Sequence, residues 1–102
     1  MKQTEAGMLN PKYKKELIKI INKYLPQTKI YLYGSRARGD QSEGSDVDLA
    51  LDINKPIDFS VIGNIKEEIE ESTIPLFVDT VDIRSISPDF LAEIKKDWIK
   101  WQ

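Results

Sequence analysis

The chain contains neither cysteine nor histidine among its 102 residues. Without cysteine there can be no disulfide framework, no thiolate zinc site and no cysteine nucleophile. Without histidine, serine–histidine catalysis is excluded as well. Any proton transfer or metal binding therefore depends on carboxylates, whose hard oxygen atoms favour cations such as Mg²⁺.

Long apolar runs and a strong excess of one charge are also missing. No run approaches the roughly 20 residues of a membrane-spanning helix, and the N-terminus lacks the apolar centre of a signal peptide. We therefore expect a cytoplasmic protein with no membrane partner. The formal net charge of −2 supplies no overall basic field, so direct binding of nucleic acid is not expected. The length predicts a single domain over residues 1–102, too small to include a separate substrate domain.

The hydrophobic pattern predicts an α/β (α+β) fold, a small mixed β-sheet flanked by helices. Residues 1–9 have no pattern and are expected to be a loose lead-in. Asn10-Pro11 and Ser87-Pro88 each combine an N-cap residue with a proline at the first helical position. The expected order is helix 11–25, strand 30–33, strand 46–51, helix 59–71, strand 76–81 and a helix from residue 88 to the C-terminal tryptophans. The second helix is expected to bury a stripe of Phe59, Ile62, Ile65 and Ile69.

The predicted last helix has more apolar side chains than one face can bury. Ile94 and Trp98 lie one turn apart, whereas Ile99 and Trp101 fall elsewhere around the helix. Two interpretations stay open. Either the tryptophans pack on the sheet and over the domain edge, or they form a docking surface for another protein, since aromatic residues are enriched at interfaces.

A glycine-serine turn followed by two spaced aspartates is the most informative part of the sequence. Gly34-Ser35 follows the apolar strand 30–33, and Asp46 and Asp48 are two residues apart in the next strand. Strand alternation sends such residues to one face, where their carboxylates repel unless a divalent cation neutralises them. Gly34 lets the backbone approach a ligand, and Ser35 offers an N–H and a hydroxyl to phosphate oxygens. The combination predicts a nucleoside triphosphate site.

Each of these features also has a purely structural interpretation. The glycine-serine pair can be an ordinary tight turn, and the two aspartates can be charges that protect a strand edge. Aspartate is unfavourable in strands, however, so two in one short strand favour metal binding. Arg36 and Arg38 are either surface charges or groups that bind the triphosphate or the acceptor, and the sequence leaves both open.

The ordered segments Gly34-Ser35-Arg36-Ala37-Arg38-Gly39 and Ser45-Asp46-Val47-Asp48-Leu49 resemble the signature of the DNA polymerase β-like nucleotidyltransferase superfamily. They are most similar to its minimal nucleotidyltransferase branch, also called MNT or MntA-like. The resemblance extends over residues 13–98. It implies the polymerase β-like fold and transfer of a nucleoside monophosphate, with AMP from ATP expected, to a hydroxyl acceptor.

The resemblance also implies roles for individual residues. Asp46 and Asp48 are expected to bind Mg²⁺, in a site that uses two ions. The family takes a third carboxylate from a later strand, and Val78-Asp79-Thr80-Val81 is similar to that strand, which assigns catalysis and metal binding to Asp79 rather than to Asp82. The expected contacts to the nucleotide are Gly34, Ser35, Arg36 and Ser45.

A partner protein is implied in the same way. Minimal nucleotidyltransferases are typically paired with a HEPN-domain toxin, a small helical RNase, and act as its antitoxin by adding AMP to a tyrosine of the toxin. The resemblance therefore predicts a HEPN partner that provides the acceptor hydroxyl. The alternative is a non-catalytic antitoxin or regulatory binding module that acts by occlusion, and the intact glycine-serine and aspartate motifs argue against it.

Overall fold

The computed structural model describes residues 9–42 and 44–102. Its elements are α2 (Pro11–Tyr24), β1 (Lys29–Tyr33), α3 (Ser35–Arg38), β2 (Val47–Asp52), α4 (Phe59–Glu70), β3 (Val78–Asp82), α5 (Pro88–Asp97) and β4 (Ile99–Lys100). The strands form one sheet in the order β3-β2-β1-β4. β1 is antiparallel to β2 and β4, and β2 is parallel to β3, so the predicted mixed sheet with flanking helices is confirmed.

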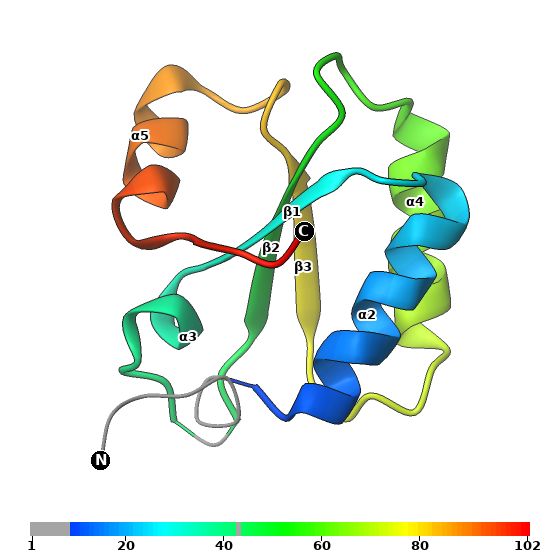
Figure 1. Ribbon diagram of the computed structural model, residues 1–102, viewed down its shortest axis with the longest axis vertical. Coiled ribbons are helices and arrows are strands. Elements are labelled where there is room, and N and C mark those ends of the chain that lie inside the picture. The colour runs from blue at the N-terminus through cyan, green and yellow to red at the C-terminus, as the bar shows by residue number, and fades with distance from the viewer. Residues whose placement is uncertain (1–8, 43) are drawn as a thin grey trace.

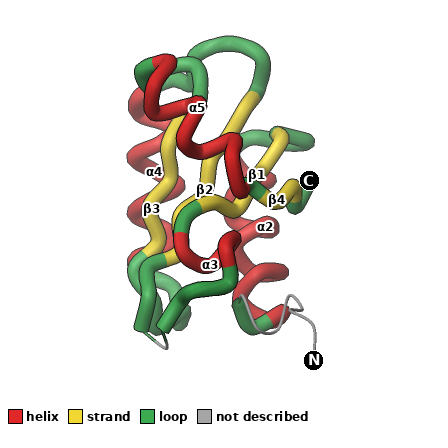
Figure 2. The backbone as a smooth tube through the Cα atoms, turned by 90° about the vertical axis from the view of Figure 1, so that its left-hand side faces the viewer, coloured by secondary structure: helices red, strands yellow, loops and turns green. Residues whose placement is uncertain are grey.

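The helices cover the two faces of the sheet unequally (Figure 1). α2 and α4 lie together on one face, where Leu17, Ile30, Leu49 and Ile65 form part of the main core. α5 lies on the other face and packs Ile94 against Ala50 and its neighbours. Figure 2 shows α5 over one end of this second face and α3 at the other end. The second face is therefore covered by shorter segments than the first, with α3 at the end where β1 leads into it.

The predicted helix starts are confirmed. The side chain of Asn10 accepts a hydrogen bond from the backbone N–H of Lys12 at 2.9 Å, and that of Ser87 accepts one from Phe90 at 3.1 Å. The expected lead-in needs one correction, because Leu9 is buried in the main core. Its apolar side chain lies directly before the cap of α2 and follows that helix into the core. Residues 1–8 lie outside the described residues.

The predicted apolar stripe of α4 is wrong at one position. Ile65 and Ile69 are buried, but Phe59 is 91% exposed. With 3.6 residues per turn, Phe59 lies about 120° around the helix from Ile65, whereas Val61 lies only about 40° from it. Val61 accordingly packs against the core in the place expected for Phe59.

The C-terminal residues leave the helix earlier than predicted. α5 ends at Asp97, and Trp98 has extended backbone angles. The Trp98 ring stacks on Tyr31 with centroids 3.7 Å apart, and β4 then pairs with β1. Ile99 and Trp101 pack against the main core. An extended chain turns these side chains to both faces, so the prediction of apolar area left over on a helix is wrong, and the packing interpretation of the tryptophans holds.

Candidate active site

Gly34 joins β1 to α3 in a conformation that requires glycine. Its φ of 79° lies in the left-handed region. A Cβ built on Gly34 would lie 2.5 Å from Oδ2 of Asp48. The absence of a side chain therefore lets the end of β1 pass directly beside this carboxylate. The predicted turn at Gly34 and the predicted metal ligand Asp48 are therefore in contact.

The strand registers bring two of the predicted aspartates together. Asp48 in β2 is the register partner of Asp79 in β3 and of Tyr33 in β1. Register partners on neighbouring strands share a face, and the strands lie about 4.8 Å apart. Asp46 immediately precedes Val47, the first residue of β2, and is exposed, so it lies at the strand entrance rather than within the predicted strand.

The electrostatics of this group reflect like charges brought close together. Burial, followed by the charges of Asp79 and Asp46, raises the pKa of Asp48 above its ordinary value, while Arg38 opposes the shift. Burial and the charges of Asp48 and Asp79 also raise the pKa of Tyr33 to about 12. All three aspartates are therefore part of one electrostatic group.

Tyr33 is a candidate site residue that the sequence analysis missed. It is 8% exposed and forms an edge-to-face contact with Phe90 of α5, with centroids 6.1 Å apart. One signal was present in the sequence, because Tyr33 is the last strand residue before the glycine and alternates with the core residues Ile30 and Leu32. Its position near two carboxylates follows only from the pairing of β1 with β2 and of β2 with β3.

The structure separates Asp79 from its competitor Asp82. The Asp82 carboxylate is buried and accepts hydrogen bonds from the Ile57 N–H at 2.8 Å, the Ser85 hydroxyl at 2.8 Å and the Arg84 N–H at 3.0 Å. These bonds stabilise loops beyond the end of β3. Asp79 instead lies beside Asp48 with a side chain 41% exposed, and its Oδ1 is 3.8 Å from Nζ of Lys66 in α4.

Arg36 is buried, with 6% exposure, so the surface-charge interpretation is wrong for this residue. Its Nε and Nη2 donate hydrogen bonds to the carbonyl oxygen of Ser45 at 3.1 and 2.9 Å. The Ser45 hydroxyl in turn accepts a bond from the Ser42 N–H at 2.8 Å. Arg36 thus connects α3 to the loop that leads into Asp46. Arg38 is exposed, and its Nε is 3.2 Å from Asp40.

The donor set fits Mg²⁺, although within residues 9–42 and 44–102 no three carboxylates already lie at the spacing of a metal site. Mg²⁺ is usually bound by one or two protein carboxylates together with substrate phosphates, so a preformed cluster of three is not required. Burial and repulsion by neighbouring aspartates raise the pKa of Asp48, and the repulsion is what a divalent cation would remove. Asp46, Asp48 and Asp79 are the residues that could bind it.

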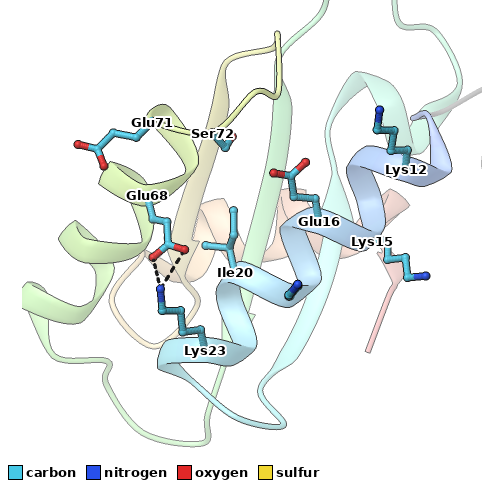
Figure 3. A pocket seen from close by; sticks show the side chains of 9 residues that line it. Lys12, Lys15, Glu16, Ile20, Lys23, Glu68, Glu71 and Ser72 are labelled. Carbon is cyan, nitrogen blue, oxygen red and sulfur yellow. Dashed lines mark hydrogen bonds and ion pairs between the residues drawn. The ribbon is translucent and has the colours of Figure 1, made fainter.

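Two grooves flank α4. The larger, of about 820 Å³, lies between α2 and α4, includes Lys12, Lys15, Lys19 and Lys23 in its lining, and includes none of the predicted site residues (Figure 3). The smaller, of about 660 Å³, runs between α4 and β3 and reaches Lys66 and Asp79. Of these two grooves, the smaller includes one of the predicted site residues, Asp79, in its lining. In the described part of the chain, no helix is long and apolar enough to cross a membrane.

Comparisons with known proteins agree with this geometry. Residues 15–99 match the family described as "Polymerase beta, Nucleotidyltransferase". A protein of Haemophilus influenzae named "Probable protein adenylyltransferase MntA" is 34% identical over 80 residues, which are 78% of this chain and 70% of that protein.

Solved structures show the same fold. A crystal structure of a toxin–antitoxin with AMP-PNP has a TM-score of 0.73 at 25% identity, covering 85% of this chain and 70% of that one. A structure of a tri-AMPylated Shewanella oneidensis HEPN toxin in complex with an MNT antitoxin has a TM-score of 0.69 at 21% identity, covering 88% and 69%. The chain therefore belongs to the polymerase β nucleotidyltransferase family, in its minimal MntA-like branch, and is a nucleotidyltransferase.

Proposed function

We propose that this chain transfers AMP from ATP to a hydroxyl group of a HEPN-type partner protein, and that it is the antitoxin of that pair. The observation that supports the site is the convergence of Gly34, Asp48 and Asp79, each from a different element, where β1 leads into α3. The relative named as a protein adenylyltransferase supports the reaction, and the likeness to toxin–antitoxin complexes supports the partner. A cytoplasmic location stays a prediction.

Asp46, Asp48 and Asp79 are the proposed Mg²⁺ ligands in this scheme. A bound Mg²⁺ would neutralise the phosphate charge and lower the pKa of the acceptor hydroxyl, and a second ion would fit the same set of carboxylates. Gly34 and Ser35 would leave room for the triphosphate and donate to it from the backbone. Ser45 would shape the neighbouring loop through its local hydrogen bonds.

The proposed reaction is an in-line substitution at the α-phosphorus. The acceptor oxygen forms a bond to the α-phosphorus, the bond from this phosphorus to the oxygen bridging to the β-phosphate breaks, and pyrophosphate leaves. The acceptor proton passes to a carboxylate within reach, for which the half-exposed Asp79 is the candidate. Arg36 takes a positioning role, because its hydrogen bonds are made to the loop before Asp46.

The test is to incubate the protein with α-labelled ATP, Mg²⁺ and the product of the neighbouring reading frame, and to follow label on that protein. Asp48→Asn should abolish both transfer and Mg²⁺-dependent stabilisation by ATP. Asp79→Asn should lower turnover by about 100-fold or more, with a much smaller loss of ATP affinity, because its main contribution is to the transferring step.

Asp97→Asn, at an exposed position at the end of α5, is the matched control and should behave as wild type. Equal ATP stabilisation of wild type and Asp48→Asn would contradict the metal assignment. If the wild-type protein suppresses its partner without transferring label, the non-catalytic occlusion alternative is correct instead.

A further inference from the structure

The smaller groove has an apolar side next to the candidate site. Phe77 is 66% exposed although it is aromatic and lies two residues before Asp79, with Leu76 and Ile74 preceding it in the lining. The carbonyl of Phe77 accepts a hydrogen bond from the Val47 N–H at 2.9 Å, so the backbone here already extends the line of β3. An exposed aromatic ring two residues from a proposed catalytic carboxylate is a typical anchor for a bound partner.

The groove also runs along a free strand edge. β3 is the outermost strand of the sheet, and within the described residues its outer side pairs with no other strand. The unpaired N–H and C=O groups of such an edge can bind an extended peptide as an additional strand. Lys66 in α4 and Asp79 in β3 approach each other at one end of this edge, at 3.8 Å.

Gly63 leaves space on the helical wall of the groove. A Cβ added to Gly63 would have no atom within 4 Å beyond its own helix, so packing within this chain does not require glycine there. Glycine inside a helix costs roughly 0.5–1 kcal/mol relative to alanine. The presence of glycine at position 63 is explained if another molecule approaches this face of α4 closely.

The charges of the groove favour one kind of occupant. Glu67 and Glu70, both exposed, line the α4 wall, and Asp79 adds a third negative charge against the single cation Lys66. This balance repels a phosphate backbone and attracts basic side chains. The occupant expected from the charge is therefore a polypeptide with apolar and basic residues, and not a nucleic acid.

We propose that the groove between α4 and the edge of β3 binds an extended segment of the acceptor protein. In this arrangement apolar side chains lie against Phe77, basic ones face Glu67 and Glu70, and the residue with the acceptor hydroxyl reaches Asp79. The inference rests on the proposed AMP transfer and adds to it the surface that selects the acceptor.

The test separates acceptor recognition from chemistry by measuring KM and kcat for the partner protein and, by calorimetry, the Kd for MgATP. Phe77→Ser, Gly63→Leu and the double change Glu67→Lys with Glu70→Lys should each raise the KM for the partner by about tenfold, the loss typical of an interface anchor. The kcat at saturating partner and the Kd for MgATP should stay at wild-type values. Gly63→Leu should at the same time raise Tm, since leucine favours the helix, which excludes misfolding as the cause.

Matched controls lie on the same helix or at its C-cap, outside this groove. Phe59→Ser, Asn64→Leu and Glu71→Lys change exposed positions that do not line it, and each should leave the KM for the partner unchanged. An unchanged KM in all three groove variants overturns the proposal. The proposal would also be overturned if a 20-nucleotide single-stranded RNA competed with the partner and this competition were lost in the groove variants.

A failure of the proposed function would be recognised separately, because wild-type protein would then place no label on the partner. In that case the affinity for the partner, measured directly without ATP or Mg²⁺, tests whether the groove binds the partner. A loss of about tenfold in Phe77→Ser and Gly63→Leu, with unchanged controls, supports a docking segment. Equal affinity of wild type and variants overturns it.

Discussion

At Asp48, the ionised carboxylate that metal binding would need is the form that the folded protein disfavours. Asp48 lies between Tyr33 and Asp79 in the sheet, against the backbone of Gly34. Burial and two neighbouring aspartates raise its pKa, so the folded protein disfavours the charge that a metal ligand needs. A group of this kind lowers stability and is typical of a functional site.

Asp48→Asn should therefore stabilise the protein in the absence of nucleotide. Because the pKa of Asp48 is higher in the folded state, that state binds more protons between the two pKa values, and stability falls as pH rises through this window. The variant should melt higher than wild type at pH 7, by about 4–8 °C for each kcal/mol of charge burial and repulsion relieved. The advantage should vanish below pH 3.8, the ordinary pKa of the group. Calorimetry at both pH values checks this, and a lower Tm for the variant at pH 7 would contradict it.

At the scale of elements, the short α3 and the loop that follows it form one unit. The guanidinium of Arg36 is buried and donates twice to the Ser45 carbonyl, which lies next to Asp46. The position of Asp46, an exposed and proposed metal ligand, thus depends on a buried cation in another element. The planar fork of arginine can make both hydrogen bonds, which the point charge of lysine cannot reproduce.

Arg36→Lys distinguishes this positioning role from a direct contact to phosphate. If Arg36 orients the loop, the variant should weaken MgATP binding by about tenfold and lower the free energy of unfolding by roughly 1–3 kcal/mol, because buried polar groups lose partners. If charge alone matters, lysine should preserve the affinity. Calorimetric titration and urea unfolding measure both quantities. Arg38→Lys, at an exposed position, should change stability by less than about 0.5 kcal/mol.

At the scale of the molecule, the unequal covering of the sheet creates the site. α2 and α4 complete one face, while α5 covers the part of the second face around Tyr33, Ala50 and Ile94 (Figure 2). The remaining part of that face is where Asp48 and Asp79 stay accessible. Trp98 stacks on Tyr31 in the part of the face that α5 covers, and the chain then continues into β4.

Trp98→Ala should consequently destabilise the whole domain rather than affect partner binding. Losing the stacked ring and its half-buried area should cost roughly 1.5–3 kcal/mol of the free energy of unfolding. Phe59→Ala, which removes an aromatic side chain that is 91% exposed, should cost less than about 0.5 kcal/mol. Urea unfolding of the two variants provides the comparison. Similar losses in both would contradict the packing role of Trp98.

The sequence by itself determined the features that depend on neighbours along the chain. The caps at Asn10 and Ser87 and the strand that ends at Gly34 follow from local hydrogen bonding and from apolar periodicity. The motif of Gly34, Asp46 and Asp48 indicated the family for the same reason, since its spacing is short and ordered.

The tertiary structure alone decided the features that depend on distant pairings. The registers of β1, β2 and β3 place Tyr33 and Asp79 on either side of Asp48, and the loop after α3 buries Arg36. The pairing of β4 with β1 ended the last helix earlier than its apolar pattern predicted. Local propensity cannot specify such contacts, because they join residues that are far apart in the chain and form only when the strands align.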